Sequence, residues 1–147
     1  MRLVIQRISK GKVSVENKAV SEASKGYFIL VGVGQQDSEY EANFLAQKVT
    51  KLRIMQDESG KMNLTLKDAD GEALVVSQFT LYADTKDGNR PSFIKAARPE
   101  KARLVYDHFV EKLKSYGIKT KTGKFGEYMK IEVVLDGPVT IVMGSSS

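Results

Sequence analysis

Ser77, Gln78 and Thr80 bring two hydroxyl groups and one amide to the end of an apolar stretch. The segment directly follows the apolar run 74–76, which is typical of a buried strand. At a strand end, such polar groups can line a pocket and donate hydrogen bonds, and neighbouring backbone N–H groups could stabilise an oxyanion. The alternative is a strand that becomes half exposed, with its Ser and Thr side chains facing water. The residues alone leave both interpretations open.

The dipeptide Gly137-Pro138 interrupts the last apolar part of the chain. Because proline has no N–H to give to a β ladder, the dipeptide requires a bulge, an edge or a tight turn, and a cis bond is possible. A turn of purely structural purpose is the default interpretation.

Composition and spacing argue against most familiar catalytic centres. His108 is the single histidine, and a lone histidine in a predicted helix is more often a surface or packing residue than a catalyst. Without a Gly-x-Ser-x-Gly elbow, a Ser-His-Asp hydrolase is not expected. There is no cysteine and no His-x-x-x-His, and the neighbouring acids Asp68, Asp70 and Glu72 read as a solvated turn, so no metal site is predicted. Gly32 and Gly34 resemble half of a dinucleotide fingerprint but lack its third glycine, and we expect no cofactor.

The excess positive charge is confined to one segment. The net charge is +5, and residues 98–130 hold nine Lys or Arg against four acids, while the rest of the chain balances at 14 against 14. This distribution is typical of a surface that meets a phosphate backbone. A solvated helix face followed by a basic turn is the alternative. The nine basic residues are Arg98, Lys101, Arg103, Lys112, Lys114, Lys119, Lys121, Lys124 and Lys130.

Patterns in the first half predict several strands and one helix. Three β-rich segments separated by Gly11 and Asn17 indicate a meander, at residues 2–9, 12–16 and 18–23. The nearly continuous apolar run 27–33 favours a central strand covered on both faces. Ser38 and Glu41 form a capping box that opens a helix. Its predicted apolar stripe consists of Tyr40, Phe44, Leu45, Val49 and Leu52.

The middle of the chain alternates between irregular and regular segments. Residues 56–70 are rich in Asp, Gly, Lys and Asn and predict a loop or an irregular hairpin. Residues 73–81 predict a strand. The polar stretch 84–92 is too broken for regular structure and is a plausible functional loop.

A second helix and two strands are predicted toward the C-terminus. Pro99 suits the first turn of the helix and Gly117 ends it. Residues 129–135 and 139–143 predict two strands joined through the Gly-Pro dipeptide, followed by a frayed tail at 144–147. The apolar stripe of the second helix consists of Ala102, Val105, Tyr106, Phe109, Val110 and Leu113. Residues 1–147 therefore predict one α/β domain, with mixed β-sheet layers and two main helices packed on one face.

No apolar run approaches the roughly 20 residues needed to cross a bilayer, and the N-terminal residues lack the apolar core of a signal peptide. We therefore expect a soluble, cytoplasmic protein without a membrane partner.

The two unusual segments together resemble the D-aminoacyl-tRNA deacylase family, whose paired signatures are Ser-Gln-Phe-Thr-Leu and Gly-Pro-Val-Thr. Here they are residues 77–81 and 137–140. The similarity extends over nearly the whole chain, through segments 5–7, 60–63, 90–93 and 122–125. Leu135 stands where many members carry Asn, a departure that concerns the turn before Gly137.

The resemblance implies a homodimeric enzyme that cleaves the ester of D-aminoacyl-tRNA, a chiral proofreading step in translation. Gly137 and Pro138, through a cis bond, would reach into the partner's active site and leave no room for an L side chain, whereas glycyl-tRNA could also be cleaved. Arg7 would help to orient this segment. The pocket around the ester would be lined by Ser77, Gln78, Phe79 and Thr80. Phe125 and Met129 would lie near the terminal adenosine of tRNA.

Two mechanisms remain open for such an enzyme. The 2′-OH of the tRNA ribose lies beside the ester carbonyl and could assist the attacking water. Thr80 as a covalent nucleophile is the rival. Two other functions are also compatible with the residues, namely a non-catalytic tRNA-binding domain and a hydrolase that acts on small esters through Ser77 or Thr80.

Overall fold

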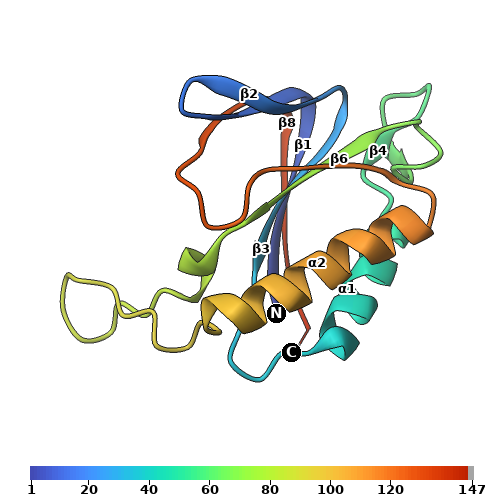
Figure 1. Ribbon diagram of the computed structural model, residues 1–147. Helices are drawn as coiled ribbons and strands as arrows, with labels where there is room; N and C mark the ends of the chain where they lie inside the picture. Colours follow the sequence, from blue (N-terminus) through green and yellow to red (C-terminus); the bar gives the residue numbers. More distant parts are fainter. Residues whose placement is uncertain (146–147) are drawn as a thin grey trace.

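Six strands form the main sheet of the computed structural model, which describes residues 1–145 (Figure 1). The strands β1 (Arg2–Val15), β2 (Lys18–Ala23), β3 (Gly26–Gly32), β6 (Glu72–Ser77) and β7 (Lys119–Thr122) lie in the order β2-β1-β3-β6-β7. β8 (Lys130–Gly144) pairs with the edge of β1 that lies opposite both β2 and β3. Only the β3–β6 and β6–β7 pairs are parallel among these described strands, so the predicted mixed sheet is confirmed.

β1 is one strand of 14 residues, so the predicted break at Gly11 is wrong. A Cβ at Gly11 would lie 2.9 Å from the Leu74 side chain, so this glycine allows a close approach inside the sheet. The predicted turn at Asn17 is confirmed, because Glu16 and Asn17 both have positive φ values, 51° and 64°. β1 is therefore long enough to pair with β3 through its first half, β2 through its second half and β8 along most of its length.

β8 is also a single strand, not the two strands predicted. Gln6 pairs with Thr140 while Ile8 pairs with Leu135, so residues 136–139 bulge out of the ladder. The bulge accommodates the proline, as predicted. The strand continues through Gly144, and the Met1 amino group donates to Ser145 Oγ at 2.8 Å. The predicted frayed tail is therefore wrong for residues 144–145, and its last two residues, 146–147, lie outside the described part.

Both predicted helices are present in residues 1–145. Helix α1 (Glu39–Lys51) begins at the predicted Ser38 and Glu41 capping box. Its predicted stripe is partly wrong, because Tyr40 is 74% exposed and Phe44 39% exposed. The buried residues are Ala42, Leu45, Ala46 and Val49, whose small members let α1 approach its neighbours closely.

Helix α2 (Pro99–Ser115) has Pro99 in its first turn, and its six predicted apolar residues are all buried. Gly117 follows the helix with a φ of 83°, which confirms it as the terminating residue.

Two apolar clusters lie on opposite faces of the sheet. The larger cluster joins α1 and α2 to one face of the sheet. Figure 1 shows both helices on this face. The smaller cluster includes Ile8, Phe28 and Leu74 on the other face. The Ser21 hydroxyl donates to the Thr122 carbonyl at 2.6 Å, which links β2 to β7 around this second cluster. The predicted packing of both helices on one face is confirmed.

Residues 56–70 contain the predicted irregular hairpin, formed by β4 (Met55–Gln56) and β5 (Met62–Leu64). The predicted strand 73–81 is too long, since β6 ends at Ser77 and the 3₁₀ helix η1 (Phe79–Tyr82) follows. In residues 1–145, neither helix is long and apolar enough to span a membrane.

Candidate active site

The polar residues Ser77, Gln78 and Thr80 lie where β6 ends and η1 begins. Ser77 shares the alternation of Ala73 and Val75, so it lies on the helix-covered face of the sheet. The Gln78 backbone N–H donates to the Val31 carbonyl at 2.7 Å and ends the pairing with β3. The Gln78 amide donates to Thr80 Oγ1. Ser77, Gln78 and Thr80 are therefore neighbours at the exposed end of a buried strand.

Two aromatic rings stand beside these polar groups. Phe79 and Phe93 are 55% and 36% exposed, and their rings meet edge to face with centroids 5.0 Å apart. Asp84 and Ser92 exchange two backbone hydrogen bonds, which close the predicted loop 84–92 and bring Phe93 to η1. Exposed aromatic rings can stack with unpaired bases. Phe93 is absent from the predicted site residues, although its segment 90–93 belongs to the resemblance and Phe93 directly follows the polar loop 84–92.

The second predicted element, Gly137-Pro138, lies in the β8 bulge and has a cis peptide bond. Gly137 has a φ of 138°, and a Cβ there would lie 2.7 Å from the Val139 nitrogen. Arg7, which is 3% exposed, donates from Nε to the Asp136 carbonyl at 3.1 Å and from Nη1 to the Ile54 carbonyl at 2.8 Å. A buried guanidinium on β1 therefore holds the start of the bulge.

Within one chain the two predicted elements are far apart. Ser77 pairs with Val31 in β3, which pairs with Leu3 in β1. The bulge instead lies beside Arg7, further along β1 and on its other edge. Ser77 and the bulge are three strand spacings of about 4.8 Å apart across the sheet, with an offset of about 13 Å along the strands. Their separation along the sheet is therefore about 20 Å. Among residues 1–145, no hydrogen bond joins residues 77–80 to residues 136–139.

Phe125 and Met129 lie in the same connection but pack in different places. Phe125 packs against the helix-side cluster, and the centre of its ring lies 5.8 Å from the centre of the Tyr106 ring. The Arg103 guanidinium lies 5.8 Å from the Phe125 ring. Met129 packs against the smaller cluster on the other face. The structure therefore does not bring these two predicted residues together.

His108 lies between the two helices, with Nε2 at 2.7 Å from Asn43 Oδ1 and Nδ1 at 3.8 Å from a Glu39 oxygen. This placement fits the packing role expected for it. In the described part of the chain, the acidic residues and His108 form no group of three that could hold a metal ion.

Comparisons with known proteins show the family of the chain. The model of the family described as D-Tyr-tRNA(Tyr) deacylase matches residues 4–144. A protein from Thermotoga petrophila named D-aminoacyl-tRNA deacylase is 53% identical, over 99% of this chain and 98% of that protein. A protein of the same name from Fusobacterium nucleatum is 50% identical, over 97% of this chain and 95% of that protein. The chain belongs to the D-Tyr-tRNA deacylase family, and the family resemblance seen in its sequence is confirmed.

Two solved structures share the fold. One, titled c-Myc DNA Unwinding Element Binding Protein, has a TM-score of 0.93 and 36% identity, and the match covers 100% of both chains. The other is titled as a probable eukaryotic D-amino acid tRNA deacylase, with a TM-score of 0.85 over 97% of both chains. Its identity of 16% supports the fold alone.

Proposed function

We propose that this chain hydrolyses the ester bond of D-aminoacyl-tRNA and releases the free D-amino acid and tRNA in the cytoplasm. The observation that carries this proposal is the family match over residues 4–144, which includes both segments 77–81 and 137–140. The relatives from Thermotoga petrophila and Fusobacterium nucleatum are named for this activity. Incubation with D-Tyr-tRNA, followed by measurement of free tyrosine, tests it.

The ester would lie against η1, with Ser77, Gln78, Phe79 and Thr80 around it. The exposed hydroxyl of Thr80, the neighbouring Gln78 amide and the exposed ring of Phe79 support this assignment. Hydroxyl, amide and backbone N–H groups can orient an ester and stabilise the negative charge that develops on its carbonyl oxygen. None of these groups is a strong base at neutral pH. A threonine hydroxyl is a weak nucleophile unless another group activates it, so these residues alone do not activate Thr80.

The substrate itself would supply the missing group. The 2′-OH of the terminal ribose is adjacent to the ester and already oriented, so it can assist the attacking water. Thr80 would then contribute position, not a covalent intermediate. The rival mechanism makes Thr80 Oγ1 the nucleophile.

Selection against L-amino acids would come from main-chain oxygens at Gly137 and Pro138 of a second protomer. The separation of about 20 Å along the sheet supports a contribution from another copy, since one chain cannot bring its own bulge to its own η1. The free edge of β8 carries exposed Val134, Leu135 and Val142, which are 46%, 46% and 74% exposed. Apolar side chains on an unpaired edge favour association of two copies. A steric wall of this kind would accept many D-amino acids, and also glycine, which has no side chain.

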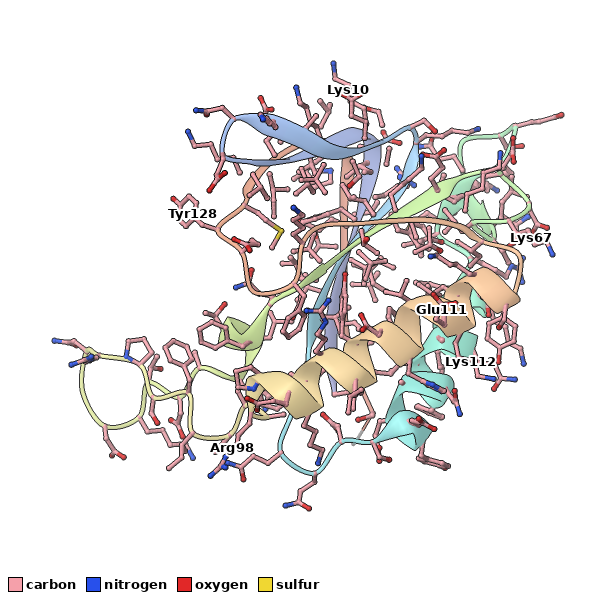
Figure 2. The ribbon with its side chains drawn as sticks, in the orientation of Figure 1. Lys10, Lys67, Arg98, Glu111, Lys112 and Tyr128 are labelled. Carbon is pink, nitrogen blue, oxygen red and sulfur yellow. The ribbon has the colours of Figure 1, made fainter. Side chains whose placement is uncertain are left out.

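The tRNA would be held mainly by charge. Of the nine basic residues in segment 98–130, four lie on α2, two lie on β7, and Arg98 directly precedes α2. Figure 2 shows Arg98 near one end of α2 and Lys112 toward its other end. This arrangement supports contact with successive phosphates. Phe125, half-buried beside Arg103, would contact the terminal adenosine. Met129 packs against the cluster on the other face of the sheet, so it would not contact the same base.

A non-catalytic nucleic-acid-binding role is the second candidate. It is favoured by the basic segment and by the solved structure named as a DNA unwinding element binding protein. This role predicts that the chain binds tRNA without releasing an amino acid.

A further inference from the structure

Gly32 and Gly34, which resemble half of a dinucleotide fingerprint, have a different role in this fold. Both lie where η1 packs on the end of β3. A Cβ at Gly32 would lie 2.9 Å from Leu81 Cβ and 3.2 Å from the Gln78 carbonyl oxygen. A Cβ at Gly34 would lie 2.8 Å from the Tyr82 hydroxyl oxygen. The two glycines therefore leave the space in which η1 is seated.

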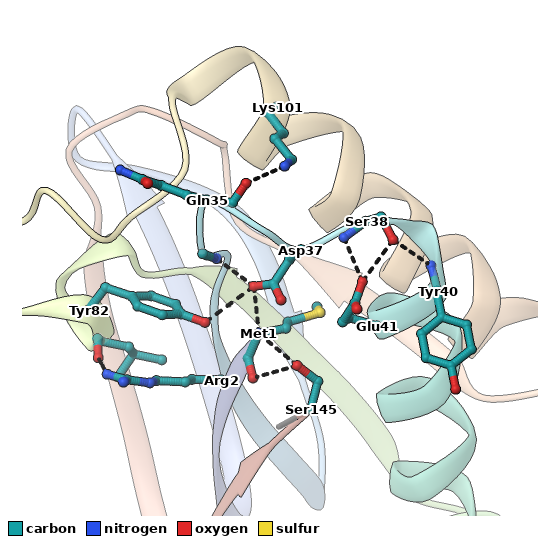
Figure 3. Close-up of polar contacts among 12 residues, drawn as sticks. Met1, Arg2, Gln35, Asp37, Ser38, Tyr40, Glu41, Tyr82, Lys101 and Ser145 are labelled. Carbon is teal, nitrogen blue, oxygen red and sulfur yellow. Dashed lines mark hydrogen bonds and ion pairs between the residues drawn. The ribbon is translucent and has the colours of Figure 1, made fainter. Parts of the chain in front are cut away.

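Asp37 joins η1 to the rest of the molecule, as Figure 3 shows. Its side chain is 10% exposed, and its Oδ2 accepts a hydrogen bond from the Gly34 N–H at 2.6 Å and one from the Tyr82 hydroxyl at 3.2 Å. The Met1 amino group lies 2.5 Å from the same oxygen. A buried carboxylate with three partners is fixed in position, because losing any of them would leave charge unsatisfied.

Tyr82, the last residue of η1, is held from two sides. Its hydroxyl donates to Asp37, while the Arg2 guanidinium lies 4.3 Å from the centre of its ring. Arg2 Nη1 also donates to the Leu81 carbonyl at 2.8 Å. Burial, followed by the Asp37 charge, raises the pKa of Tyr82 to about 12, so the hydroxyl stays protonated into alkaline pH.

η1 cannot fix its own position. It has four residues and no side-chain cap at its N-terminal end. Short 3₁₀ segments have poor hydrogen-bond geometry and gain their order from tertiary contacts. Phe79 and Thr80 lie on the exposed side of η1, between a contact at its start, where the Gln78 N–H donates to the Val31 carbonyl, and a contact at its end, where Tyr82 donates to Asp37.

We propose that Asp37 and Tyr82 are positioning residues, which set the location of Phe79 and Thr80 through the Tyr82 hydroxyl. This inference rests on the proposed function, because it takes η1 to be the surface that receives the ester. It assigns to Asp37 a role in holding η1, and to Gly32 and Gly34 the role of leaving the space that η1 occupies. A displacement of a few tenths of an ångström to 1 Å at Thr80 would slow the reaction without weakening tRNA binding.

Kinetics of four variants test the proposal. Tyr82→Phe keeps the ring and removes the hydroxyl, and it should lower kcat for D-Tyr-tRNA about tenfold with KM changed less than about twofold. Tyr27→Phe is the matched control, because it also removes a tyrosine hydroxyl that donates a hydrogen bond. That hydroxyl donates to the Leu52 carbonyl at 3.3 Å, away from η1. Its kcat should stay within about twofold of the wild type. Asp37→Ala combined with Tyr82→Phe should be no slower than Asp37→Ala alone, because either change removes the hydrogen bond between Tyr82 and Asp37.

Amide hydrogen exchange provides a measurement that does not depend on activity. Leu81 and Ala83 donate backbone hydrogen bonds within η1 and at its end, to Gln78 O and Thr80 O. In Tyr82→Phe these two amides should exchange at least about tenfold faster, while the amide of Phe109 in α2 stays unchanged. Unchanged exchange at Leu81 and Ala83, or a Tyr82→Phe kcat equal to that of Tyr27→Phe, would overturn the proposal. A wild-type protein that released no tyrosine would count against the proposed function alone, and the exchange rates would still decide this inference.

Discussion

Arg7 and Asp136 are joined twice, through the main chain and through the side chain. Arg7 Nε donates to the Asp136 carbonyl at 3.1 Å and lies 3.3 Å from the Asp136 carboxylate. The guanidinium is buried and also donates to the Ile54 carbonyl. One side chain thus connects β1, the segment after α1 and the bulge in β8. Arg7 therefore lies where it can hold the residue that precedes Gly137 and Pro138.

Arg7→Lys should lower both stability and chiral selectivity. Lysine cannot replace the planar set of donors, so a main-chain oxygen would lose its partner at a cost of about 1–3 kcal/mol. Urea denaturation measures this loss, and the ratio of D-Tyr-tRNA to L-Tyr-tRNA cleavage should fall. Arg53→Lys is the control, because Arg53 also donates to a main-chain oxygen, Asn63 O at 2.8 Å, but is exposed. A variant of Arg7 as stable and as selective as the Arg53 control would show that Arg7 does not hold the bulge.

Thr80→Ala and a tRNA ending in 2′-deoxyadenosine separate the two mechanisms. If the 2′-OH assists the water, the deoxy substrate should be cleaved about 100-fold more slowly or worse. Thr80→Ala should then retain activity within about tenfold, since Thr80 supplies position only. Single-turnover release of D-tyrosine measures both. Loss confined to the Thr80 change would instead assign the nucleophile to Thr80.

Lys121 and Lys124 are exposed basic residues of the positively charged segment, close to Phe125. Replacing both with Ala should weaken tRNA binding and reduce the dependence of log Kd on log salt by about 1–2. Fluorescence anisotropy at several salt concentrations measures this slope. The control is the double change of Lys10 and Lys48 to Ala, two exposed residues outside the segment. Equal slopes for the two double variants would mean that segment 98–130 is an ordinary solvated surface.

Tyr27 should make the protein less stable at alkaline pH. Burial raises the pKa of Tyr27 from 10.0 to about 12. Between these values the unfolded chain releases the proton and the folded chain keeps it, so the free energy of unfolding falls as the pH rises. The stability advantage of the wild type over Tyr27→Phe should therefore shrink between about pH 9 and about pH 11. Urea denaturation at both pH values checks the sign, and a constant difference would contradict it.

Local signals in the sequence predict the parts of the fold that depend on neighbouring residues. The capping box at Ser38 and Glu41 fixes the start of α1, because both members lie within one helical turn. Pro138 predicts the irregularity in β8, because its missing N–H is a property of the residue itself. These predictions needed no knowledge of distant contacts.

Long-range contacts account for the errors. Gly11 predicts a break by its type, but it lies inside a strand because Leu74 packs against it. Tyr40 has the right spacing for a buried stripe, yet it is exposed. The buried face of α1 includes Ala42 and Ala46 instead. The importance of Asp37 depends on Tyr82, 45 positions further along the chain, and on Met1. No window of neighbouring residues contains those partners.

The measurement that tests the account most directly is the release of free tyrosine from D-Tyr-tRNA and L-Tyr-tRNA by the wild-type protein, side by side at equal tRNA concentration. We expect rapid release from D-Tyr-tRNA and release from L-Tyr-tRNA no faster than in the absence of protein. Equal rates on the two substrates would contradict the chiral filter at Gly137 and Pro138. Tight binding of both tRNAs with no release from either would contradict the enzymatic function itself.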